Sequence, residues 1–151
     1  MSCGCRFWWW CLGAISISSD IPTPMKVPMT TIFVCTTCRQ PHLRETKPNP
    51  PCGEQMVEQV RRAAEANPSV TVQPVACLMG CEHGCNIAIS GAGKLSYVLG
   101  GFAPVADDAE AIAEYAVKHA QSESGVVPYR EWPQGVKGHF ISRIPPIPDA
   151  K

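Results

Sequence analysis

Two groups of closely spaced cysteines constrain the fold of this chain more than any other feature of its sequence. The first group is CTTC over residues 35–38, and the second is CLMGCEHGC over residues 77–85. Each group begins at the end of an apolar, β-branched run, TTIFVC over 30–35 and SVTVQPVAC over 69–77, and such runs predict buried strands. The fold therefore has to place thiols at the ends of two strands.

The rest of the chain predicts the elements that accompany these strands. Apolar residues at helical spacing predict two helices, over residues 54–67 and over residues 107–121. Turn residues between two short apolar runs predict a hairpin, with strands over residues 86–90 and 94–100. The order strand, helix, strand, strand, strand, helix is that of an α/β, thioredoxin-like fold with a central mixed sheet. A right-handed crossover makes the first two strands parallel neighbours, so we expect Cys35 and Cys77 at the same edge of the sheet.

The chain divides into three segments. Residues 1–28 form a leader that we interpret as a disordered tail or a wrongly assigned start, with a targeting segment as the alternative. Residues 29–121 form the thioredoxin-like domain, and residues 122–151, rich in proline and glycine, are expected to wrap the surface as an extended tail. The three cysteines of the leader are not considered as ligands: Cys3, Cys5 and Cys11.

The charge and the cysteine content exclude several classes of protein. Thirteen basic and 13 acidic residues leave a net charge of zero, whereas nucleic acid and anionic membranes attract a basic excess. The nine clustered cysteines, an odd number, do not resemble a secreted disulfide framework and favour metal binding or redox chemistry in the reducing cytoplasm. We find no Ser-His-Asp set, paired-carboxylate site or nucleotide fingerprint, so the sequence does not predict an enzyme.

Three chemistries are compatible with the two cysteine groups, and the residues alone leave all three open. A [2Fe–2S] cluster takes four thiolates, two for each iron, and two converging loops can supply them. Four cysteines also suit Zn²⁺ or another soft divalent metal. A Cys-x-x-Cys pair can instead exchange disulfides, but redox thioredoxins carry it at the start of the first helix, whereas here a proline-rich stretch separates Cys38 from that helix.

The stretch VACLMGCEHGCNIAISGAGKLSYVLGGF over residues 75–102 resembles the second ligand loop of thioredoxin-like [2Fe–2S] ferredoxins. More closely, residues 29–148 resemble a family of small bacterial predicted metal-binding proteins, through VCTTCR, the central Cys-x3-Cys-x3-Cys and the closing GVVPYREWP. Members of that family are associated with cobalt and cobalamin functions. The resemblance implies a four-thiolate site with the ligands Cys35, Cys38, Cys77 and Cys81. Cys85 is an additional candidate ligand. Cys52, which stands just before the first predicted helix, is a rival to Cys38 as the second ligand.

From these motifs we expect a small one-electron carrier or accessory redox module that holds one [2Fe–2S] cluster and meets a redox partner protein. Thioredoxin-like ferredoxins are often dimers, so the resemblance also suggests a homodimer. The alternatives are a zinc- or cobalt-binding structural or metal-handling protein and a thiol–disulfide oxidoreductase, which would need an exposed, reactive Cys35. His83 is expected to face solvent rather than to bind iron, and the other histidines are expected at the surface: His42, His119 and His139.

Overall fold

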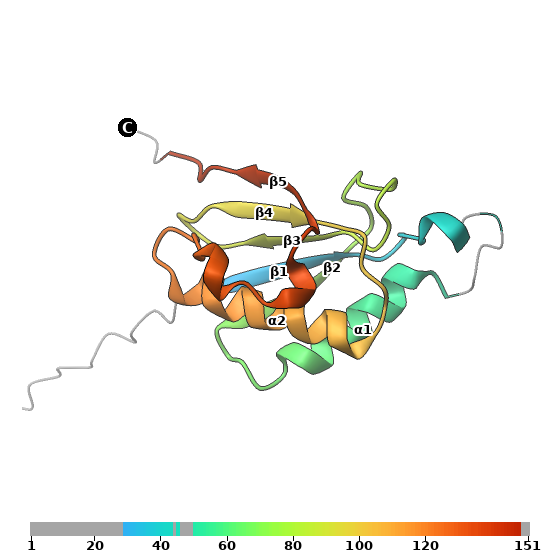
Figure 1. Ribbon diagram of the computed structural model, residues 1–151, viewed down its shortest axis with the longest axis horizontal. Helices are drawn as coiled ribbons and strands as arrows, with labels where there is room; N and C mark the ends of the chain where they lie inside the picture. The colour runs from blue at the N-terminus through green and yellow to red at the C-terminus, as the bar shows by residue number, and fades with distance from the viewer. Residues whose placement is uncertain (1–28, 44, 46–49, 149–151) are drawn as a thin grey trace, which may run out of the picture.

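A five-stranded mixed sheet forms the centre of the protein in the computed structural model, which describes residues 29–43, 45 and 50–148 (Figure 1). The strands lie in the spatial order β2-β1-β3-β4-β5. Their bounds are Thr30–Cys35 for β1, Val70–Val75 for β2, Ile87–Ser90 for β3, Ser96–Leu99 for β4 and Phe140–Ile144 for β5. The leader predicted over residues 1–28 lies outside the described residues.

The sequence of β1 explains its central place in the sheet. Ile32 and Val34 are fully buried on one face, while Thr31 and Phe33 are half-buried on the other. β1 pairs in parallel with β2 and antiparallel with β3, and β4 and β5 continue the sheet in antiparallel pairs. The parallel β1–β2 pair and the β3–β4 hairpin confirm the predicted thioredoxin-like order of strands.

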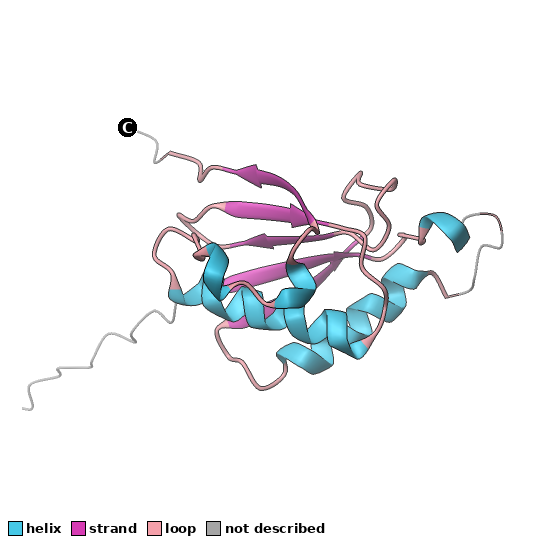
Figure 2. Ribbon diagram, in the orientation of Figure 1, coloured by secondary structure: helices cyan, strands magenta, loops and turns pink. Residues whose placement is uncertain are grey.

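Two helices, α1 (Cys52–Ala64) and α2 (Ala106–Gln121), pack against each other and against the same face of the sheet (Figure 2). Apolar residues at helical spacing explain why α1 lies there, since they form one buried stripe: Met56, Val57, Val60 and Ala64. A short 3-10 helix, η1 (Pro41–Leu43), precedes α1. No helix in the described part of the chain is long and apolar enough to cross a membrane.

The C-terminal segment has more regular structure than the extended tail that its proline and glycine content predicts. It forms two short 3-10 helices, η2 (Tyr129–Glu131) and η3 (Gln134–Val136), and then β5 pairs antiparallel with β4. Trp132 stacks on Phe140 with the ring centroids 4.2 Å apart, and its indole nitrogen donates to the Val127 carbonyl over 2.8 Å. Aromatic packing therefore holds this segment against the sheet.

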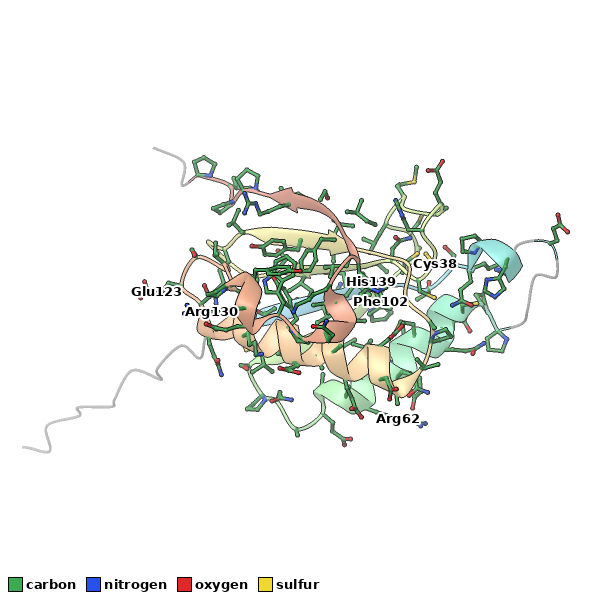
Figure 3. All side chains as sticks on the ribbon, in the orientation of Figure 1. Cys38, Arg62, Phe102, Glu123, Arg130 and His139 are labelled. Carbon is green, nitrogen blue, oxygen red and sulfur yellow. The ribbon has the colours of Figure 1, made fainter. Side chains whose placement is uncertain are left out.

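Two of the histidines expected at the surface make specific contacts instead. His119 is fully buried in α2, where its ring nitrogens lie 2.9 Å from the Thr30 hydroxyl and 2.7 Å from the Leu95 carbonyl oxygen. His139 stacks on Phe102 with ring centroids 4.2 Å apart (Figure 3). The surface prediction is wrong for His119 because a core accepts a polar ring when both of its nitrogens have hydrogen-bond partners.

Candidate metal centre

The carboxyl ends of two parallel strands bring both cysteine groups to one edge of the sheet, as predicted. Cys35, the last residue of β1, pairs with Val75, the last residue of β2, and Cys77 follows two positions later. Beyond the strands, the Thr37 hydroxyl donates to the Ala76 carbonyl over 2.6 Å. The first cysteine loop (residues 35–40) and the second cysteine loop (residues 76–85) therefore leave the sheet side by side, at the right-hand end in Figure 1.

Cys35 and Cys38 form a buried pair of thiols in the first cysteine loop. Only 1% and 3% of their surfaces are exposed, and the two thiols hydrogen-bond one another. Burial by itself raises the pKa of Cys35, but hydrogen bonds from the Cys38 thiol and from the Leu78 and Thr37 amides bring that pKa below its usual value. The pKa of Cys38 is raised to about 11, mainly by burial. Within the pair, the pKa of Cys35 therefore lies below that of Cys38.

Cys77 and Cys81 lie exposed on the second cysteine loop. The Met79 amide donates to the Cys77 sulfur over 3.3 Å from a backbone with a φ of +60°, and 88% of the Met79 surface is exposed. The Leu78 amide of the same loop donates to the Cys35 sulfur. Amide groups of the second loop thus point at sulfurs of both loops, an arrangement that stabilises anionic thiolates.

The two remaining described cysteines, Cys52 and Cys85, belong to the core. Cys52 opens α1 with 2% of its surface exposed, and Cys85 is fully buried with a φ of +33°. Burial is the first cause that raises the pKa of Cys85, to about 12, and the charges of Cys52, Cys38 and Cys35 add to it. Cys85 therefore lies near the other three buried thiols, and its own sulfur stays protonated at neutral pH.

The predicted ligands do not form a closed metal cluster. Within the part of the chain that the structure describes, no three His, Cys, Asp or Glu side chains lie close enough to hold a metal ion together. Cys35 contacts Cys38, whereas Cys77 and Cys81 lie on the adjacent loop, where His83 is exposed as predicted. The donor set nevertheless fits a thiolate-bound group, because the two loops converge and amide groups already point at three of the four sulfurs.

One residue of this site, Asn86, is missing from the sequence-based prediction. Its side chain is fully buried, and its amide nitrogen lies 3.2 Å from the Cys38 sulfur and donates to the Gly80 carbonyl. A signal for it exists in the sequence, because a single asparagine stands between Cys85 and the apolar strand that begins at Ile87. A polar side chain at the start of a buried strand must find hydrogen-bond partners there.

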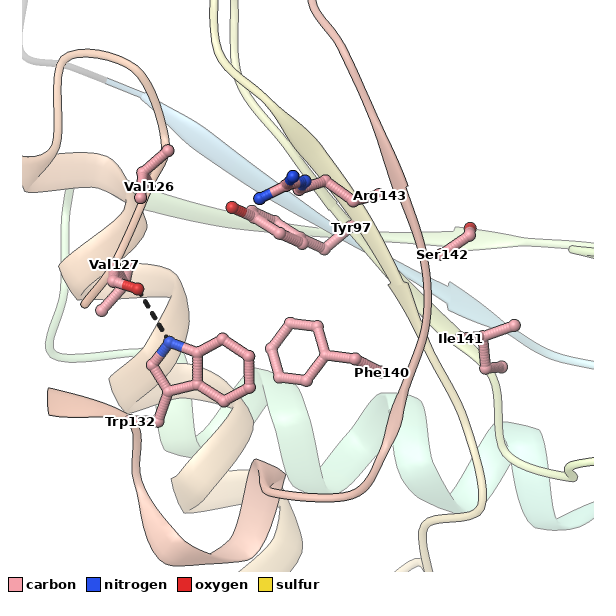
Figure 4. A pocket seen from close by; sticks show the side chains of 8 residues that line it. All are labelled: Tyr97, Val126, Val127, Trp132, Phe140, Ile141, Ser142 and Arg143. Carbon is pink, nitrogen blue, oxygen red and sulfur yellow. Dashed lines mark hydrogen bonds between the residues drawn. The ribbon is translucent and has the colours of Figure 1, made fainter. Parts of the chain in front are cut away.

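A cavity of about 290 Å³ between β4, β5 and the C-terminal segment contains no thiol (Figure 4). Aromatic and aliphatic side chains form most of its wall, with one guanidinium group. The lining residues are Tyr97, Val126, Val127, Trp132, Phe140, Ile141, Ser142 and Arg143. Because none of them belongs to either cysteine loop, the cavity is separate from the candidate metal centre.

Comparisons with known proteins give one family match. The sequence profile of a family described as "Protein of unknown function (DUF1636)" matches residues 32–146. Among curated proteins, no relative matches the chain.

Solved structures give only remote likenesses. A thioredoxin-like [2Fe–2S] ferredoxin from Aquifex aeolicus is 19% identical over 78% of this chain and 94% of that chain, with a TM-score of 0.48. A second structure of such a ferredoxin from the same organism is 18% identical over 76% of this chain and 97% of that chain, with a TM-score of 0.44. Likenesses this remote neither assign a cofactor to the chain nor argue for its function.

Proposed function

The chain belongs to the family described as "Protein of unknown function (DUF1636)", and we propose that it binds a [2Fe–2S] cluster and carries single electrons or serves as an accessory redox module. The proposed ligands are Cys35 and Cys38 after β1, and Cys77 and Cys81 after β2. One observation carries the proposal: the parallel pairing of Cys35 with Val75 brings both cysteine loops to one edge of the sheet. Four thiolates from two such loops meet the needs of two iron atoms.

The hydrogen bonds at the sulfurs support an anionic site rather than a set of free thiols. The Leu78 and Met79 amides donate to the sulfurs of Cys35 and Cys77, respectively. Such donors offset the negative charge of ligating thiolates and tune the reduction potential of a cluster. The bound cluster would supply the one-electron chemistry, while the chain supplies the thiolates, the amide dipoles and a wall that excludes water.

The two halves of the proposed site differ in exposure and would have different roles. Cys35 and Cys38 are buried, so they would anchor the cluster against the core. Cys77 and Cys81 are exposed, so their side is where we propose that a redox partner protein approaches. Because closely spaced cysteines in a reducing compartment more often bind metal than form disulfides, we also propose a cytoplasmic location.

A four-thiolate site for Zn²⁺ or another soft divalent metal is the second candidate function. The exposure of Cys77 and Cys81 favours it, since a metal held on that side can be exchanged with solvent. Disulfide exchange is less well supported, because it needs an accessible attacking sulfur and only 1% of the Cys35 surface is exposed. The association with cobalt and cobalamin functions and the homodimer, both implied by the resemblance, stay predictions.

Anaerobic purification of the full chain tests the cluster. The wild-type protein should be red-brown, show thiolate-to-iron charge-transfer bands and contain about two irons and two inorganic sulfides per chain. A colourless protein with stoichiometric zinc would refute the cluster and favour the second candidate. A protein without metal would refute both.

Single cysteine substitutions test the ligand set. Cys38→Ser should bleach or destabilise the cluster, because a hydroxyl binds iron more weakly than a thiolate. Cys52→Ala and Cys85→Ala are the matched controls, since both thiols are buried nearby and lie outside the proposed set, and both variants should keep their iron. If Cys52→Ala lost its iron while Cys38→Ser kept it, Cys52 rather than Cys38 would be the second ligand.

A further inference from the structure

We propose that Asn86 is a positioning residue that fastens the second cysteine loop to Cys38 and sets the reduction potential of the site. The inference rests on the proposed function, because it concerns the surroundings of the proposed ligands. Asn86 stands directly before β3, and none of its surface is exposed. An asparagine in such a place needs a reason that apolar packing does not provide.

The other buried polar side chains have a different explanation. The described residues include four of them: Thr30, Asn86, Lys94 and His119. Three meet at the end of α2, where the Thr30 hydroxyl bonds the His119 ring and the Lys94 ammonium donates to the His119 carbonyl over 3.1 Å. Asn86 is the member of this set that contacts a thiol.

Asn86 hydrogen-bonds both cysteine loops at once. Its side-chain nitrogen lies 3.2 Å from the Cys38 sulfur and also donates to the carbonyl of Gly80, the residue before Cys81. Its backbone carbonyl accepts from the Cys35 amide over 3.0 Å, and its backbone amide donates to the Cys38 sulfur. One residue therefore links the end of β1, the first cysteine loop and the second cysteine loop.

Two glycines make room for the Asn86 side chain. A Cβ atom on Gly80 would lie 2.5 Å from the Asn86 Oδ1 atom, and one on Gly100 would overlap the same atom. Neither glycine has a positive φ, so a turn does not require them, and in both cases the nearest atom that a Cβ would meet belongs to Asn86. In this narrow space Oδ1 has no hydrogen-bond partner among the described residues. An unpaired buried oxygen lowers the stability of the core, so core packing alone does not explain an asparagine at this position. The two hydrogen bonds that its side-chain nitrogen donates do explain it.

The direction of these bonds suits a sulfur that carries negative charge. An N–H group that donates to a thiolate forms a charge-assisted bond, which is stronger and more directional than a bond to a neutral thiol. Hydrogen bonds to metal ligands orient them, and their removal typically lowers metal affinity about 10- to 100-fold. Loss of a donor to a ligating sulfur also destabilises the reduced, more negative cluster, so the reduction potential should become more negative.

Two substitutions in the full chain remove the donor in different ways. Asn86→Asp keeps the shape but turns a carboxylate oxygen towards Cys38 and Gly80, and Asn86→Ala removes the amide altogether. Asn67→Asp is the matched control, because Asn67 follows α1 and, among the described residues, it has backbone hydrogen bonds only. Under anaerobic conditions both Asn86 variants should hold less iron than the wild type, and the iron that stays bound should titrate at a more negative potential. Asn67→Asp should match the wild type in both measurements.

Titration of the metal-free chain with Co²⁺ gives a readout that does not depend on a cluster. The wild type should bind Co²⁺ with sulfur-to-cobalt charge-transfer absorbance, and both Asn86 variants should bind it about 10- to 100-fold more weakly. A wild type without iron would refute the proposed cluster. The role of Asn86 would then be judged only from the Co²⁺ affinities of the wild type and the two variants. Unchanged potential and unchanged Co²⁺ affinity in the variants would overturn the inference. So would a wild type that binds neither metal, or a failure of both variants to fold, since Asn86 would then be a structural residue only.

Discussion

Gly53 lets the start of α1 approach the end of β1, and its substitution by alanine tests how closely the helix must approach. A Cβ atom on Gly53 would overlap the Cys35 carbonyl oxygen and lie 2.6 Å from the Thr36 carbonyl oxygen. The Gly53 amide also donates to the Cys38 carbonyl over 3.0 Å. Because both neighbours are backbone atoms, no side-chain rotation can relieve the overlap.

We expect Gly53→Ala to lower the free energy of unfolding by about 2 kcal/mol. Overpacking of a tight contact costs about 1–3 kcal/mol, and the upper part of that range applies because two backbone segments must separate. The higher helix propensity of alanine offsets up to about 1 kcal/mol of this loss. For a chain of this size, the melting temperature should fall by roughly 4–8 °C.

Urea and thermal denaturation, followed by circular dichroism, measure this loss, with Gly93→Ala as the control. Gly93 has open space around it but a φ of +70°, so alanine there costs about 1 kcal/mol through backbone strain alone. Gly53→Ala should be the less stable variant and, because its helix shifts away from Cys38, should also retain less iron. A Gly53→Ala protein that is as stable as the wild type would refute the close approach of α1 to β1.

Two further predictions concern the core. Burial lowers the pKa of His119 below 6.5, against the opposing hydrogen bond to the Leu95 carbonyl, so the unfolded chain takes up a proton at a higher pH than the folded chain. The free energy of unfolding should therefore fall as the pH drops below about 6.5, and His119→Gln should weaken this dependence in urea denaturation at about pH 7.5 and about pH 5.5. Trp132→Ala should lower the free energy of unfolding by about 2–3 kcal/mol, because it removes the stacking on Phe140 and the bond to the Val127 carbonyl. A loss below about 1 kcal/mol in the same assay would mean that the C-terminal segment does not depend on this ring.

The regular elements were predictable where the pattern along the chain is strong. The strand predicted over residues 30–35 is β1 itself, because its apolar run is continuous and buried. The predicted start of α1, residue 54, lies two residues after the observed start at Cys52. The hydrogen bond from the Gly53 amide to the Cys38 carbonyl helps to define this start, and the two residues belong to separate segments of the chain. β5 (Phe140–Ile144) was missed because most of its side chains are exposed, so no alternation marks it, and the free edge of β4 makes it a strand.

The sequence by itself determined the chemistry that the candidate site can offer. The residue types and their spacing predict thiolate ligands, and the handedness of the strand–helix–strand unit brings Cys35 and Cys77 to one edge of the sheet. Both follow from local patterns and from a general rule of chain connection. Neither requires knowledge of distant contacts.

Only the tertiary structure decided how the thiols differ from one another. It buries Cys35 and Cys38 and exposes Cys77 and Cys81, although all four are the same residue type in similar loops. It also makes Asn86 the residue whose side chain bonds both the Cys38 sulfur and the Gly80 carbonyl. The physical reason is that burial and hydrogen bonding depend on which remote segments meet, and here three loops separated in sequence close around one amide group.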